Sequence, residues 1–328
     1  MKIIKKTMIL FMIFCLLLSS AGCTKSQKKP SKEDANSKKA MPEVIKSIEK
    51  DILLVMQQVD LTLYFNRSIE QKKQLEKEML EMKKILKDEK SSGEKPKEES
   101  SNTGEDKESQ KEDVSKKEPN PLMFPEMVLQ DILKNEKVLP EDNESTKAPT
   151  DINETWKKIN TTIISIHNKF NILEPLIIEK NAGSLAITKF KDTLDQLTNY
   201  VLEKKYFETI TLANQLTLYL PEFMAHFETK IPPTAYTLKF YTRDIVLKSS
   251  KNDYKSANNN INELIQKSKV LKSFLTNKNS KPIIEKFDAA LVNFQNAVKK
   301  HDINLIKINA AIVMKNIVII SKEIESKI

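Results

Sequence analysis

The chain of 328 residues has only two cysteines, Cys15 and Cys23, and both lie close to its amino terminus. Everything after Cys23 therefore lacks thiols. This excludes cysteine nucleophiles, thiolate metal sites and internal disulfides from the rest of the chain. Because no covalent cross-link can stabilise the fold, the protein must bury a hydrophobic core of ordinary size.

Glycine is almost as scarce, with four residues in the whole chain. Gly22, Gly93 and Gly104 precede the apolar-patterned C-terminal part, which holds only Gly183. Phosphate-binding loops and nucleophile elbows need glycines where the backbone turns sharply or meets a ligand. The sequence thus excludes a P-loop, a dinucleotide fingerprint and a GxSxG motif in that part.

Histidine and catalytic carboxylate patterns are also missing. His167, His226 and His301 are the three histidines, and no two are spaced to bind one metal from a single helix. No pair of acids stands out from apolar surroundings, as a general acid would. We therefore expect no catalytic residues, no metal site and no cofactor, and a protein that is not an enzyme.

The formal charge of +9 is concentrated at the amino terminus. Segment 1–23 supplies +3 and segment 24–40 a further +4, which leaves +2 for all that follows. Nucleic-acid binding needs a basic face on the folded part. We expect no nucleic-acid partner. Lysines close to a membrane would instead favour anionic headgroups, although they would serve equally as a solvated tether.

The amino terminus has the pattern of an export signal. Lys2, Lys5 and Lys6 precede an apolar run, 8–18, that is too short for an ordinary spanning helix. The sequence Ser20-Ala21-Gly22-Cys23 resembles the lipobox of bacterial lipoproteins, with Ser20 where leucine is commonest. This resemblance implies a signal peptide over 1–22, cleavage before Cys23, and a diacylglycerol with chains such as palmitate on the Cys23 thiol. Residues 23–41 would be a lipidated basic tether at the outer face of the cell membrane. A plain secretory signal and an uncleaved anchor are the alternatives.

A long amphipathic helix is predicted over 42–88, opening at Pro42. Its length would be about 70 Å. Such a stripe needs a partner surface, and we expect it to pack on the downstream domain. Self-association of residues 43–88 as a coiled coil is the rival interpretation. The apolar positions are Ile45, Ile48, Ile52, Val55, Val59, Leu63, Ile69, Leu75, Met79, Met82 and Leu86.

Lysine, glutamate, serine and aspartate fill 89–121 almost completely, and we predict a disordered polyampholyte linker there. Residues 122–149 follow as a short amphipathic segment and loop. That segment is predicted to be a helix docked on the main domain. A linear motif that binds a partner is the second interpretation.

Residues 150–328 predict an all-α domain. Asp151 and Glu154 form a possible capping box, and a 3–4 apolar spacing then continues to Leu173. Six more helical stripes follow, with no alternating strand pattern between them. They span 187–201, 210–227, 238–245, 257–271, 284–298 and 306–324.

Two of these helical pairs are copies of each other, related by a shift of 97 residues. The middle pair is a candidate third copy. We predict repeated helical hairpins that form a bundle or short solenoid. Identical residues under the shift are Ile187/Ile284, Lys189/Lys286, Phe190/Phe287, Leu194/Leu291, Asn199/Asn296, Val201/Val298 and Ala213/Ala310.

Arg243 is the candidate ligand-binding residue. The chain has 52 lysines but only two arginines, and an arginine offers a planar two-pronged donor that lysine lacks. Together with Tyr241 it would bind a carboxylate or phosphate. A structural salt bridge is the alternative interpretation, and Arg67 is a weaker candidate.

These features predict a membrane-anchored, non-enzymatic lipoprotein that binds or scaffolds another envelope component, its partners being membrane lipid through Cys23 and an envelope protein. The chain is similar in general character to all-helical lipoproteins of Gram-positive bacteria to which no function can be attached. The alternative is a carrier of a small ligand, haem or metal that serves a transporter. An enzyme is the third hypothesis.

Overall fold

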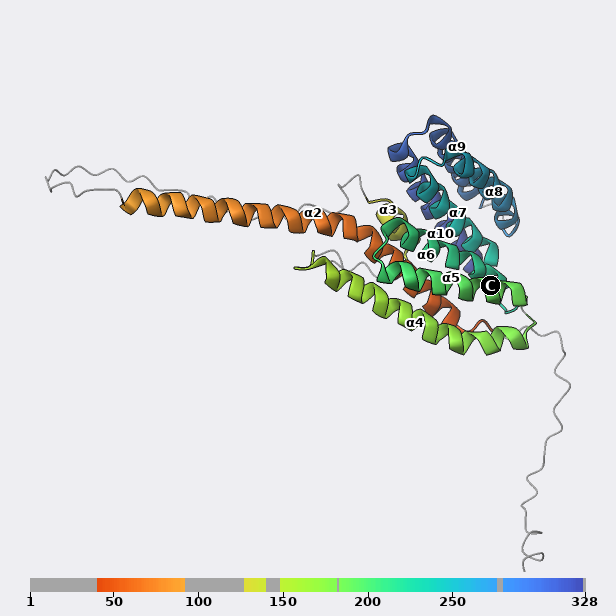
Figure 1. The fold of residues 1–328 in the computed structure, drawn as a ribbon. Helices are drawn as coiled ribbons and strands as arrows, with labels where there is room; N and C mark the ends of the chain where they lie inside the picture. The colour runs from red at the N-terminus through yellow and green to blue at the C-terminus, as the bar shows by residue number, and fades with distance from the viewer. Residues whose placement is uncertain (1–39, 92–126, 140–147, 182, 276–279, 327–328) are drawn as a thin grey trace, which may run out of the picture. The chain divides into compact units, whose positions relative to one another are not determined.

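The computed structural model describes residues 40–91, 127–139, 148–181, 183–275 and 280–326 (Figure 1). These residues contain nine α-helices and no strand apart from one isolated bridge between Ala40 and Glu228, which confirms the all-α prediction. They belong to a compact unit, Ala40–Ile328. The predicted signal, Cys23, the tether up to residue 39 and the linker from residue 92 to 121 lie outside the described residues.

Helix α2 (Glu43–Ser91) begins directly after Pro42 and extends three residues past the predicted end. Its first half packs against α4 (Ile152–Glu179) and α6 (Tyr206–Met224). The apolar stripe from Ile45 to Val59 is fully buried there, and Lys169 of α4 pairs with Asp51 of α2 at 2.6 Å. From Glu70 to Ile85 every residue is exposed. The first half of the helix thus packs within its own chain, whereas the second half extends beyond the other helices (Figure 1).

Three helical hairpins follow α4. They are α5 (Ser184–Leu202) with α6, α7 (Pro233–Ser250) with α8 (Tyr254–Ser273), and α9 (Lys281–Lys300) with α10 (Ile303–Glu325). The second helices begin at Tyr206, Tyr254 and Ile303, so successive copies follow one another at an almost constant spacing. The long shift seen in the sequence is therefore two steps of one repeat.

The turns inside the hairpins repeat as well. Lys204, Asn252 and His301 occupy equivalent places, and each has a left-handed backbone with φ of 55°, 60° and 56°. Asp253 and Asp302 cap the helices that follow, since their carboxylates accept bonds from backbone amides of the first turn.

The core is continuous across α2, α3 and the seven helices after residue 150. Within it the rings of Phe170 and Phe190 stack with their centroids 4.4 Å apart. Each fully buried large apolar side chain contributes about 1.5–3 kcal/mol. Helix α3 (Gln130–Glu136) packs on α10 and also meets α2, with Leu129, Ile132 and Leu133 buried. The compact core is thus larger than residues 150–328, because it includes one half of α2 and the α3 segment.

Candidate functional site

Arg243 lies in α7 and is only 1% exposed. Its Nη1 donates to Oε2 of Glu136 at 2.6 Å, its Nε to Oδ1 of Asn214 at 2.8 Å, and its Nη2 to Oγ1 of Thr217 at 2.8 Å. All three guanidinium nitrogens thus bond to the chain's own α3 and α6. This geometry favours the structural salt bridge over the ligand-binding role.

A second cation extends this network. Lys239, one helical turn before Arg243, places its Nζ 3.4 Å from Oε1 of Glu136 and 3.7 Å from Oε1 of Glu49 on α2. The same ammonium lies 5.0 Å above the ring of Tyr236. Two acids and two bases from α2, α3 and α7 thus form one buried group, which we call the ionic cluster (Glu49, Glu136, Lys239 and Arg243).

The pKa values of the two acids in the ionic cluster are shifted in opposite directions. Burial alone would raise the pKa of Glu136, but the charges of Arg243 and Lys239 outweigh it and hold that pKa below its usual value. Burial also raises the pKa of Glu49, and Lys239 offsets this only in part. Glu136 is therefore the acid that the cluster stabilises as a carboxylate.

Asp60 fixes the other end of the α3 segment. Its buried carboxylate accepts the backbone amides of Val128 and Leu129 at 2.8 and 2.7 Å and the hydroxyl of Tyr206 at 2.6 Å. Burial raises the pKa of Asp60, and these three hydrogen bonds lower it in part. Lys307 of α10 donates to the carbonyl of Met127 at 2.7 Å. The segment 127–136 is thus attached at both ends by buried polar contacts.

The buried polar groups therefore attach a short helix to its binding groove. A buried ion pair adds little net stability over apolar residues of the same size, whereas the loss of one partner is expensive. Nothing in this arrangement presents an activated nucleophile or a general acid to solvent. Its evident role is to hold α3 between α2, α7 and α10.

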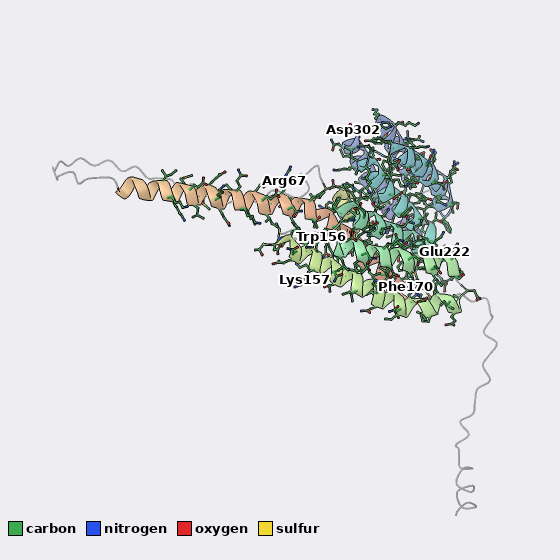
Figure 2. The ribbon with its side chains drawn as sticks, in the orientation of Figure 1. Arg67, Trp156, Lys157, Phe170, Glu222 and Asp302 are labelled. Atoms are coloured by element: carbon green, nitrogen blue, oxygen red, sulfur yellow. The ribbon has the colours of Figure 1, made fainter. Side chains whose placement is uncertain are left out.

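The other residues singled out from the sequence lie apart from one another. Tyr241 is half-buried with its ring 5.2 Å from that of Phe240, and it is not among the hydrogen-bond partners of Arg243. Arg67 is exposed on α2 (Figure 2). His167 shares a hydrogen bond with Thr198, and the described residues contain no group of three side chains suited to a metal ion.

Two of the surface clefts in the described part of the chain lie over α2, α4 and α7. One, of about 190 Å³, lies between the start of α2 and the start of α7 and includes Met41 and Tyr236. The other, of about 450 Å³, is lined by the first turn of α4 and by Trp156, Leu202 and Lys204. Neither cleft is lined by Arg243 or Tyr241.

An exposed apolar row on α10 is a surface feature that sequence reasoning missed. We call it the α10 face. It consists of four side chains that are 38 to 55% exposed and spaced along one side of the helix: Leu305, Ile308, Ile312 and Ile319.

The internal repeat supplies a control for this face. Under the shift between the first and third hairpins its four positions correspond on α6 to Glu208, Thr211, Gln215 and Glu222, which are also partly or fully exposed. The hairpin fold therefore accepts polar side chains at these positions. At one position the pattern is reversed: α6 has the apolar, half-buried Leu218 where α10 has the exposed Lys315. Aligning the two copies in the sequence could not reveal the α10 face, because the residues that matched between the copies were those at buried positions.

Helix α10 is also the one described helix whose length and composition would suit a membrane span. Half of the residues in its apolar window are buried, and it packs against α3, α7 and α9, which is the behaviour of a core helix.

Comparison with protein-family models, with curated proteins and with solved structures finds no match for the chain.

Proposed function

We propose that this protein is a membrane-anchored lipoprotein at the outer face of the cell membrane that binds or scaffolds another envelope protein, without catalysis. The α10 face carries this proposal, because it has apolar side chains at positions where the equivalent helix of the first hairpin has polar residues such as Glu208 and Thr211. Exposed apolar surface that the fold does not require is typical of an interaction site.

The anchor is supported by the amino-terminal sequence, segment 1–40. The lipobox-like ending at Cys23 would receive two or more acyl chains, which is enough for stable membrane attachment. The six lysines of segment 24–40 would add attraction to anionic headgroups, about 1 kcal/mol for each lysine near the surface.

The chemistry of the α10 face indicates an amphipathic helix as its partner. Residues 303–322 contain no acid, and Lys315 and Lys322 are exposed on the same side as Ile312 and Ile319. Within the chain, α7 packs on α6 and buries its apolar side against it. A partner helix with apolar anchors at 3–4 spacing and acidic flanks would use the same type of contact.

Site-specific crosslinking in living cells tests this proposal. A photoreactive residue at Ile312 is expected to give a discrete protein adduct, whereas the same residue at the repeat-equivalent Gln215 gives none. Ile308→Glu should abolish the adduct from position 312, and the matched control Thr211→Glu should leave it intact. Equal adducts from positions 312 and 215, or none from 312, would reject the α10 face as a binding site.

The anchor has its own test. Cys23→Ser is expected to release the protein from the membrane fraction, and the N-terminal peptide of the wild-type protein should carry the mass of a diacylglycerol. An unmodified Cys23 in the membrane-bound protein would show that another device anchors the chain.

A further inference from the structure

The outer half of α2 has an apolar stripe with no partner among the described residues of its own chain. Leu75, Met79 and Met82 are 48 to 60% exposed, and they lie on the part of α2 that continues beyond Arg67 (Figure 2). An isolated helix gains nothing from an apolar stripe in water. The stripe therefore requires a partner.

The spacing of the stripe is that of a coiled-coil seam. Leu75, Met79 and Met82 follow a 4–3 spacing and occupy heptad positions d, a and d. In this frame Glu78 is at position g and Lys83 at position e, on either side of the seam. Ile85, at g, borders the seam, and Leu80, at b, lies outside it.

The chain's own segments are poor candidates for this role. Residues 92–121 contain a single apolar side chain, Val114. The next apolar residues along the chain are Leu122, Met123 and Phe124, just before Met127. Even Leu122 can lie at most about 17 Å from Met127 along a fully extended chain. The α3 segment is attached to α2 at Asp60, and Leu75 lies about 22 Å farther along the helix than Asp60.

We infer that the stripe pairs with the same stripe of a second copy of this chain, in parallel and in register. Each Glu78 then faces Lys83 of the other copy, and twofold symmetry makes this pair twice. Toward the domain the next seam positions are Lys72 and Ser68, which are polar. The pairing is therefore confined to the outer part of α2. Because it buries few side chains, it forms a weak dimer, with a Kd of about 10 µM or more.

Analytical ultracentrifugation of residues 24–328, which include the whole compact unit, tests this inference. The wild-type protein is expected to pass from monomer to dimer over about 1 to 500 µM. Met79→Glu/Met82→Glu should remain monomeric. Lys77→Gln/Lys84→Gln, which alters the net charge equally on the outer f positions, should dimerise as the wild type does. A wild-type monomer throughout, or a dimer that survives the methionine changes, overturns the inference.

The parallel register has two further tests. Lys83→Glu should weaken the dimer about 5-fold, and adding Glu78→Lys to it should restore the affinity. Because residues 24–328 contain no cysteine, Leu75→Cys at a paired d position should form an intermolecular disulfide under mild oxidation, and Lys77→Cys should not. Failure of the charge exchange to restore affinity, or efficient crosslinking from position 77 alone, rejects this register. None of these results depends on the lipid anchor or on the α10 face.

Discussion

Removal of the Arg243 side chain is the perturbation for which the structure gives the clearest prediction. In Arg243→Met, the carboxylate of Glu136 stays buried and keeps only Lys239 at 3.4 Å, while Asn214 and Thr217 each lose a charged donor. Breaking a buried ion pair by removing one partner costs about 3–5 kcal/mol. We expect the free energy of unfolding to fall by about that amount, a large share of a typical domain's stability.

A double-mutant cycle separates the pair from its surroundings. Glu136→Gln should cost a similar amount, because it leaves the guanidinium without its counterion. The double variant Arg243→Met/Glu136→Gln should be less destabilised than the sum of the single variants by about 2 kcal/mol, since the two charges disappear together. Urea unfolding of residues 24–328 gives these values from the midpoints, provided that the slope m is the same in all variants.

An exposed ion pair provides the control. Lys191 and Glu174 lie 3.1 Å apart but are solvated, so Lys191→Met should cost no more than about 1 kcal/mol. Trypsin provides a local readout, because release of α3 exposes the bonds after Lys134 and Lys137. Additive single variants, or an Arg243→Met protein within about 1 kcal/mol of the wild type, would refute the reasoning.

Two further predictions concern the acids that hold α3. Asp60→Asn should lower the free energy of unfolding by about 1–3 kcal/mol, because the new amide places a donor where backbone amides and the Tyr206 hydroxyl already donate, whereas exposed Asp131→Asn should be neutral; equal urea midpoints for the two would contradict this. Because the pKa of Glu136 is lowered in the folded state, its stabilising contribution is present above its unfolded pKa of about 4.5 and is lost as the pH falls through the folded value. The stability difference between wild type and Glu136→Gln should therefore shrink as the pH falls below about 4.5; a difference that is constant with pH in urea titrations would exclude the charge as its source.

The fold could be predicted from local patterns because residues near many helix ends show where the helix begins or stops. Asp253 and Asp302 precede helices that they cap, and the 3–4 apolar spacing selects the buried side of α4 and of the hairpins. The repeat was visible because Phe190 and Phe287 occupy the same core position in two copies.

The site could be predicted only in part, because its contacts join residues far apart in the chain. Arg243 was noticeable as one of two arginines, but its partner Glu136 lies 107 residues away in a segment full of ordinary acids. Asp60 and Lys239 carry no local mark at all, since a charged residue on a helix is usually solvated. Only the packing of α2, α3 and α7 reveals that they are buried.

The groove for α3 has a consequence for the order in which the protein folds. One wall carries Asp60, near the start of the chain, and the opposite wall is α10, at the far end of the sequence. During synthesis from the amino terminus, α2 and the first hairpins can form early. The packing surface for residues 127–136 is incomplete until α10 has been synthesised, because α3 packs on α10. Closure of the core therefore waits for α10, because the contacts of α3 with Asp60 and with α10 cannot all form before residues 303–325 have been synthesised.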